Sequence, residues 1–180
     1  MDAAAYYVFV ATDISRDLVS LPSGLSVAKA CRAKRVWGLG GRTLYRNTLK
    51  PHDRALIYIA GAREYSQAFV AEATILGLVQ SIPVKIGPRL WPSTIPLKDF
   101  HWFRSPVFIH PILAQLDFIP DPENKKWGAV LQGAVLRITA RDYELITRTA
   151  RLALPEGTQT NDGNYRPRRK LRPEWPPAEP

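Results

Sequence analysis

The 180-residue chain has few of the side chains from which disulfides and metal sites are built. Its one cysteine, Cys31, excludes a disulfide within the chain and a cysteine-based metal cluster. Its three histidines, at positions 52, 101 and 110, are too far apart for an HxxxH or HExxH pair. We therefore expect neither a metal ion nor another cofactor.

Signature motifs of common enzyme classes are missing as well. The segment GLGG at 38–41 lacks the GK[ST] ending of a P-loop, and only Gly38 and Gly40 share the spacing of a GxGxxG dinucleotide fingerprint. No GxSxG nucleophile elbow occurs. The core carboxylates are too dispersed to nominate an acid–base pair: Asp13, Asp17, Asp99, Asp117 and Asp121. We expect a protein that is not an enzyme.

Long apolar runs are also absent, and none approaches the roughly 20 residues that cross a bilayer. The amino-terminal stretch MDAAAYYVFVA contains Asp2 and no lysine or arginine, so it does not read as a signal peptide. A single cysteine fits a reducing compartment. The sequence therefore predicts a cytoplasmic protein without a membrane partner.

The length fits one domain with a tail. Six of the sixteen prolines lie in the last 26 residues, where apolar residues become scarce. We assign residues 1–154 to one domain and residues 155–180 to a flexible, basic tail. The tail has a basic group of its own, Arg166, Arg168, Arg169, Lys170 and Arg172.

Acidic residues are absent between Leu18 and His52, in a chain whose formal net charge is +9. Uncompensated charges of one sign repel one another, which favours a polyanionic partner. We interpret this segment as a face that binds phosphates. The predicted phosphate contacts are Lys29, Arg32, Lys34, Arg35, Arg42 and Arg46.

Runs of aliphatic and aromatic residues predict buried strands at 6–11 and 54–60, and a third strand returns at 67–78. Helical spacing predicts a helix at 25–35, and Thr139 with Asp142 predicts a capping box that opens the last helix. Four prolines make 82–96 an irregular excursion. A strand at 100–109 is interrupted at Pro106, and Pro111 opens a short helix. These elements predict an α+β domain around a small bent sheet or barrel with two or three helices.

Two tryptophans suggest a binding site for a planar ring. Trp37 ends the basic segment and precedes a glycine-rich turn, whereas Trp102 lies on a strand with His101 and Phe103 on the opposite face. We predict that Trp37, on a loop, and Trp102 clamp a nucleobase, since each stacking contact contributes about 1–3 kcal/mol. The nearest polar candidates for the edge of the base are Thr12, Asp13 and Asn47.

Several short motifs occur in an order that resembles the EVE domain family of the PUA-like superfamily. They are VWG at 36–38, NTLKPHD at 47–53, LIYI at 56–59, LDFI at 116–119, NKKW at 124–127, Gly133 and DYELI at 142–146. The resemblance spans about residues 6 to 150. It implies a PUA-like fold similar to the YTH domain, whose members hold N6-methyladenine in an aromatic cage.

The resemblance implies that Trp37 and Trp102 are the walls of such a cage. It also implies that the residues after the first strand, Thr12 and Asp13, contact the edge of the base. Together with the motif residues, the expected base-binding set is Trp37, Trp102, Thr12, Asp13, Asn47, Gly38 and Tyr58. The expected partner is DNA or RNA that carries a modified, flipped or unpaired base.

Two alternatives stay open. The same pocket would serve an enzyme that modifies or removes a base, with Asp13 as the candidate acid or base. It would also serve a module that binds a small metabolite or a protein. The salt dependence of affinity separates the last alternative from a nucleic-acid reader, because phosphate contacts release counterions.

Overall fold

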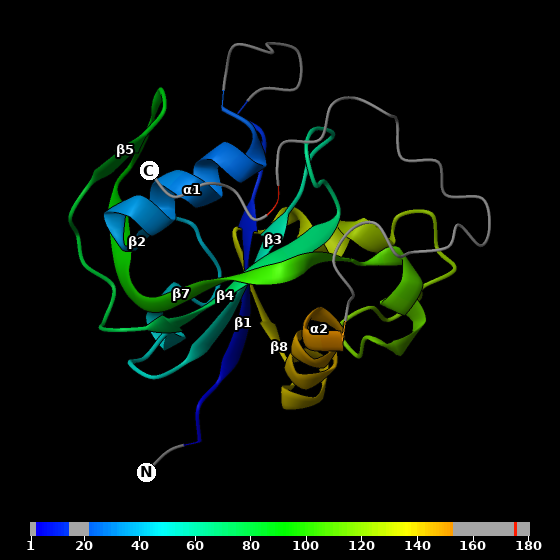
Figure 1. The fold of residues 1–180 in the computed structure, drawn as a ribbon. Helices are drawn as coiled ribbons and strands as arrows, with labels where there is room; N and C mark the ends of the chain where they lie inside the picture. The colour runs from blue at the N-terminus through cyan, green and yellow to red at the C-terminus, as the bar shows by residue number, and fades with distance from the viewer. Residues whose placement is uncertain (1–2, 15–21, 153–174, 176–180) are drawn as a thin grey trace.

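The computed structural model describes residues 3–14, 22–152 and 175 (Figure 1). The strands are β1 (Tyr6–Ala11), β2 (Val36–Leu39), β3 (Arg54–Ile59), β4 (Ala68–Ile75), β5 (Val84–Ile86), β6 (Arg89–Trp91), β7 (Ser93–Phe108) and β8 (Val135–Ile138). The α-helices are α1 (Gly24–Lys34) and α2 (Ala140–Leu152). Three 3-10 helices complete these elements: η1 (Arg46–Thr48), η2 (His110–Gln115) and η3 (Trp127–Gln132).

Six strands form one curled mixed sheet in the order β2-β7-β4-β3-β1-β8. Strands β1 and β3 run parallel, and the other neighbours are antiparallel. The long strand β7 links the edge strand β2 to the rest of the sheet, because its first residues pair with β2 and its later residues pair with β4. The register of β4 and β7 shifts between the pairs Phe69–Val107 and Ala71–Trp102. Strand β7 therefore runs through Pro106 without the predicted interruption, and this stretch is marked only by the shift in register.

The sheet separates two hydrophobic clusters, and consecutive strand residues point into different ones. Tyr7 and Phe9 belong to the cluster that α1 covers, whereas Val8 and Val10 belong to the cluster that α2 covers. Figure 1 shows the two helices on opposite sides of the central strands. We call these the α1 side and the α2 side. Burial on both sides explains why β1 reads as a continuous apolar run rather than an alternating one.

Helix α1 begins where two side chains accept hydrogen bonds from its first turn. The Oγ of Ser23, the N-cap, accepts from the backbone N–H of Ser26 at 3.3 Å, and Asp13 Oδ1 accepts from the N–H of Gly24 at 2.9 Å. The helix ends at Arg35, which has a left-handed backbone with φ of 54°. Since the backbone N–H of Leu97 donates to the Arg35 carbonyl at 2.8 Å, this end of the helix is joined to β7.

The predicted capping box of α2 is confirmed. Asp142 Oδ2 accepts from the backbone N–H of Thr139 at 3.3 Å, and the N–H of Asp142 donates to Thr139 Oγ1 at 3.1 Å. The other carboxylate oxygen of Asp142 accepts from the N–H of Asp117 at 2.7 Å. Asp142 is fully buried, so one carboxylate fixes both the start of α2 and the loop before η3.

A second polar network on the α2 side links α2 to the sheet. Arg54 Nη2 lies 3.1 Å from Glu72 Oε2, and Arg54 Nε donates to the hydroxyl of Tyr143 at 3.1 Å. The Tyr143 hydroxyl donates in turn to Glu72. Burial and the hydrogen bond to Glu72 raise the pKa of Tyr143 above its ordinary value, and Arg54 offsets this only in part.

Two expectations were wrong, and both concern the β2 region. Residues 82–96 are not irregular, since β5 and β6 form a hairpin of their own before β7 begins. Trp37 is not on a loop, because 36–39 is an edge strand paired with the start of β7. The α+β class with a small curled sheet is confirmed. Within the described ranges, no helix is long and apolar enough to cross a membrane.

Candidate nucleic-acid interface

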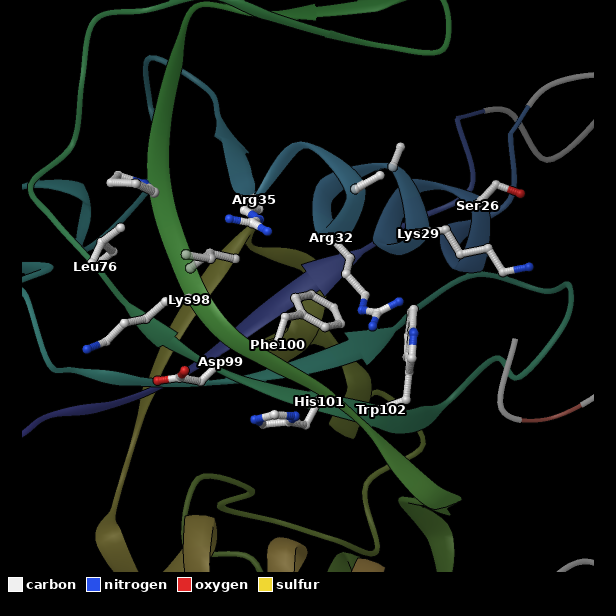
Figure 2. Close-up of a pocket in the computed structure, with 14 residues that line it drawn as sticks. Ser26, Lys29, Arg32, Arg35, Leu76, Lys98, Asp99, Phe100, His101 and Trp102 are labelled. Carbon is white, nitrogen blue, oxygen red and sulfur yellow. The ribbon is translucent and has the colours of Figure 1, made fainter. Parts of the chain in front are cut away.

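A groove of about 1190 Å³ lies on the α1 side, between α1 and β7. Its lining contains four cationic side chains and a single carboxylate: Lys29, Arg32, Arg35, Lys98 and Asp99. Phe100 and Trp102 supply aromatic surface from β7. Figure 2 shows Arg32 reaching from α1 toward these two rings. The groove therefore combines positive charge with ring faces, the two features that unpaired nucleic acid requires of a protein surface.

Trp102 is half-buried and lies among three partners. The Cζ atom of Arg32 is 6.0 Å from the centre of its ring, and Phe100 meets it edge-on at a centroid distance of 5.1 Å. The third partner is Trp175, whose ring centroid is 5.7 Å away. Trp175 also packs on Tyr65 at 4.7 Å, and its Nε1–H donates to the Phe103 carbonyl at 3.0 Å.

Trp37 lines a different and much smaller cavity, of about 20 Å³. Its indole is 3% exposed and packs on Phe9 at a centroid distance of 5.3 Å. The cavity is lined by residues of β1, α1, β2 and the β5–β6 hairpin: Val10, Thr12, Ile14, Val27, Cys31, Trp37, Gly38, Ile86, Arg89 and Trp91. We call it the hairpin cavity.

Trp91 closes the hairpin cavity by packing directly on the backbone of β2. A Cβ atom at Gly38 would lie only 2.6 Å from Trp91 Cγ, so glycine is the residue that lets the indole approach. The guanidinium of Arg89 lies over the outer indole, with Cζ 3.9 Å from its centre. This is the shortest arginine–ring distance among the described residues.

The wall of the hairpin cavity also contains the single cysteine. Cys31 is 1% exposed, and burial raises the pKa of its thiol to about 12, with a smaller opposing effect of a backbone hydrogen bond from Gly38. The thiol is thus protonated near neutral pH and acts as a small apolar group.

A third cavity, of about 630 Å³, lies at the carboxyl ends of the parallel strands β1 and β3. Thr12 and Asp13 line it on one side, and His110 and Trp127 meet edge-on within its lining at a centroid distance of 5.3 Å. Thr12 lines both this cavity and the hairpin cavity. Among the described residues, no group of three His, Cys, Asp or Glu side chains has the geometry of a metal site.

The predicted clamp of Trp37 and Trp102 is not what the structure shows. Trp37 is buried under the hairpin, whereas Trp102 lines the open groove, so the two indoles do not face each other across one gap. The second indole of the Trp37 cavity is Trp91, which the sequence reasoning missed. The apolar residues Val84, Ile86 and Trp91 around the Gly87–Pro88 turn were the available signal for a short hairpin.

The remaining residues of the predicted base-binding set are placed differently from one another. Gly38 and Thr12 line the hairpin cavity with Trp37. Asn47 is exposed on η1 and lines none of the three cavities. Tyr58 belongs to the α2-side cluster and packs on Phe69 at 5.0 Å, and burial raises the pKa of its hydroxyl.

Asp13 has a structural role. One carboxylate oxygen accepts from the N–H of Gly24, as described, and the other accepts from the N–H of Ala62 at 3.1 Å. A Cβ atom at Gly61 would lie 2.6 Å from the carboxylate, and Gly61 has a φ of 115° that favours glycine. Asp13 therefore ties the start of α1 to the loop after β3.

The predicted phosphate contacts fall into two groups. Lys29, Arg32 and Arg35 line the groove. Lys34 and Arg42 are exposed outside the lining of the three cavities. Arg46 lies near the hairpin cavity, because its Nη2 donates at 2.8 Å to the hydroxyl of Ser93, two residues after Trp91. The basic group of the predicted tail, 166–172, lies outside the described residues.

The sequence matches no protein-family model and no curated protein. Solved structures with a similar fold exist. Protein Rpa0253 from Rhodopseudomonas palustris is 16% identical, with a TM-score of 0.52 over 87% of this chain and 100% of that one. The DUF55 domain of human thymocyte nuclear protein 1 is 10% identical, with a TM-score of 0.54 over 83% of this chain and 100% of the domain.

A further similar structure is that of human THYN1 protein in complex with 5-methylcytosine containing DNA. It is 8% identical to this chain, with a TM-score of 0.53 over 82% of this chain and 98% of that one. At these identities the likeness concerns the fold alone. It confirms the predicted fold class, an α+β domain with a small curled sheet.

Proposed function

We propose that this protein is a nucleic-acid reader of the EVE type that holds a modified base in the hairpin cavity, between Trp37 and Trp91. The observation that carries the proposal is the shared lining of this cavity: two indoles, Gly38, on which Trp91 packs, and Thr12. Stacking on an indole stabilises a flipped base, and a hydroxyl supplies a hydrogen bond to its edge.

The hairpin has to move before a base can enter, because a volume of about 20 Å³ holds no more than one water molecule. Its attachment favours such a movement. Strands β5 and β6 pair with each other in a separate two-stranded sheet, so lifting them breaks none of the ladder hydrogen bonds of the six-stranded sheet. Trp91 is half-buried, and Leu90 beside it is 65% exposed.

The lining suits a base that carries a methyl group. Val27, Cys31 and Ile86 form an apolar wall next to the indoles. A methyl group buried against such a wall contributes on the order of 1 kcal/mol, which is severalfold in affinity. The solved complex of THYN1 with 5-methylcytosine DNA supports this choice of base as the first to test.

Cations near the hairpin cavity suit the phosphates of the same strand. Arg89 is exposed on the hairpin, and Arg46 is held beside Ser93 at its base. Phosphate contacts of this kind fix the position of the strand and give the affinity its salt dependence. DNA or RNA is therefore the proposed partner, and no membrane is involved in this function.

We propose further that the protein is a binding module rather than an enzyme. The best sequence candidate for an acid or base, Asp13, uses both carboxylate oxygens to hold backbone N–H groups of α1 and of the loop after β3. A base abstracting a proton needs a carboxylate oxygen that can reach its substrate. Replacement of Asp13 is thus expected to lower stability rather than to abolish turnover.

The test compares two short single-stranded DNAs that differ in one 5-methylcytosine. The wild-type protein is expected to bind the methylated strand severalfold more tightly, in line with the apolar gain of a methyl group. Trp91→Ala should remove this preference, because it removes one wall of the cavity. Fluorescence anisotropy at several salt concentrations measures the affinities, and the same strands made as RNA show which nucleic acid is preferred.

Trp127→Ala is the matched control, since Trp127 is also half-buried but lines the cavity at the ends of β1 and β3. It should leave the preference for the methylated strand intact. Equal affinity of the wild type for both strands, or an unchanged preference in Trp91→Ala, would contradict the proposed base site. An affinity that does not fall with salt would favour a small-metabolite or protein partner instead.

A further inference from the structure

We propose that the groove between α1 and β7 is a second nucleotide site, in which an unpaired base inserts between the Arg32 guanidinium and the Trp102 indole. This inference rests on the proposed function, because it takes the ligand to be a nucleic-acid strand. It adds a site that is separate from the hairpin cavity, since the two share no lining residue.

The spacing of Arg32 and Trp102 carries the argument. A base held between two flat groups needs van der Waals contact on both faces, about 3.5 Å each and about 7 Å in total. The guanidinium carbon of Arg32 already lies 6.0 Å from the centre of the Trp102 ring. A side-chain shift of about 1 Å therefore makes room for a base. Figure 2 shows both side chains extending into the groove from opposite walls.

The chemistry of the two walls suits a nucleobase of any identity. An arginine plane and an indole both stack on the π-face that every base presents, so no particular base edge is required. Phe100, edge-on to Trp102, extends the apolar surface on the same strand. The site is thus expected to bind unpaired nucleotides without a strong sequence preference.

The charges along the groove suit the phosphates on either side of that base. Lys29 lies on α1 about one turn before Arg32, Arg35 ends the helix, and Lys98 lies on the facing strand β7. One carboxylate, Asp99, opposes these cations within the lining. A strand passing between α1 and β7 would therefore meet positive charge from both walls, which favours a single strand over an uncharged ligand.

The aromatic cluster at the end of the groove already holds one flat heteroaromatic ring from elsewhere in the chain. The indole of Trp175 contacts both Tyr65 and Trp102, and its N–H donates to the Phe103 carbonyl. This packing shows that rings with an N–H edge are compatible with the cluster. It is the same chemistry that a nucleobase presents.

The experiment uses an unmodified ten-nucleotide single-stranded DNA with one 2-aminopurine in its centre. Binding to the wild type is expected to quench the 2-aminopurine fluorescence, since the base stacks on an indole. Trp102→Ala should weaken binding about tenfold and abolish the quenching, because it removes a stacking surface. Arg32→Ala should weaken binding severalfold, and Trp102→Phe should retain most of the affinity because phenylalanine still stacks.

Arg137→Ala is the matched control for charge, because Arg137 is exposed on β8, at the opposite edge of the sheet from β2. It removes the same charge and should leave both affinity and quenching unchanged. Trp102 also packs on the α1-side cluster, so circular dichroism has to confirm that Trp102→Ala is folded. Arg32→Ala tests the proposal independently, since Arg32 is half-buried and belongs to neither hydrophobic cluster.

The outcomes separate this inference from the proposed function. The groove site alone would be overturned if Trp102→Ala and Arg32→Ala bound DNA as tightly as Arg137→Ala and still quenched the fluorescence. Loss of the methyl preference in Trp91→Ala, with the affinity for unmodified DNA retained there and lowered in the groove variants, would support both sites. Absence of binding to any strand would overturn the proposed function and this inference with it.

Discussion

The two sides of the sheet differ in how their polar and aromatic groups are satisfied. On the α2 side, Asp142 accepts hydrogen bonds from the loop before η3 and from the start of α2. Arg54, Glu72 and Tyr143 form a separate hydrogen-bonded network between the sheet and α2. On the α1 side, the groove and the hairpin cavity lie next to four of the five tryptophans and several cations. The polar network of the α2 side is closed by mutual contacts, whereas the groove and the hairpin cavity of the α1 side leave space beside their rings. The space on the α2 side lies apart from that network, in the cavity at the ends of β1 and β3.

This difference indicates that the α2 side mainly stabilises the fold and that the α1 side mainly provides binding surface. A polar network whose members satisfy one another makes its surroundings rigid and costly to change. Cavities lined by rings and cations keep part of their interaction capacity for a ligand. Substitutions on the α2 side are therefore expected to lower stability with little effect on binding. Substitutions on the α1 side should change binding at a smaller cost in stability.

The largest expected effect on stability is that of Asp142→Ala. The substitution removes a fully buried carboxylate that accepts hydrogen bonds from Thr139 and Asp117. It should lower the free energy of unfolding by about 2–4 kcal/mol, measured by urea denaturation. The neighbouring Arg141→Ala, which removes an exposed ion pair, should stay within about 0.5 kcal/mol of the wild type. If folded Asp142→Ala bound DNA more weakly than the wild type, the α2 side would also contribute to binding, which would contradict the expected difference between the two sides.

An intermediate effect is expected for Gly38→Ala, which lies on the α1 side. The new Cβ would lie 2.6 Å from Trp91 Cγ, so the indole and its hairpin have to shift. Overpacking of this kind should cost about 1–3 kcal/mol of stability and change the preference for a methylated base. Gly128→Ala is the control, because a Cβ there meets no atom within 4 Å. If Gly38→Ala kept the wild-type preference for the methylated base, the position of the hairpin would not matter for base binding.

The smallest effect is expected for Tyr143→Phe, which should cost about 1 kcal/mol through the lost hydrogen bond to Glu72. Its signature is the pH dependence of stability. Because the pKa of Tyr143 is raised in the folded protein, its contribution is complete below the unfolded value of about 10 and is lost as the pH rises above that value. Tyr143→Phe should therefore lose less stability than the wild type between about pH 9 and about pH 11. Urea denaturation at each pH measures the free energy of unfolding of both proteins. An equal decrease in the two proteins would contradict this account.

The parts of the fold that were predicted correctly depend on local signals. Strands β1 and β3 are buried on both faces, so their sequences are unbroken apolar runs. The capping box of α2 depends on Thr139 and Asp142, three residues apart in the sequence. Such signals are present in the sequence whatever the rest of the chain does.

The candidate site depends on contacts between distant segments, which local signals do not contain. Arg32 and Trp102 are neighbours only because β7 pairs with β2 and β4 and α1 packs beside it. Trp91 lines the same cavity as Trp37 because Gly38, within a strand, leaves room for the Trp91 indole. Prolines at 83, 88 and 92 hid a hairpin with strands of three residues each. The sequence therefore predicted the kinds of side chain in the site but not which of them meet.

The position of Cys31 gives the protein a built-in probe. As the only thiol of the chain, it lies in the wall behind Trp37 and Trp91, where the raised pKa keeps it unreactive. Any movement that admits a base to that wall also admits a small thiol reagent. The rate at which an alkylating agent labels the unmodified protein thus reports how often the hairpin lifts, and a bound base would slow it.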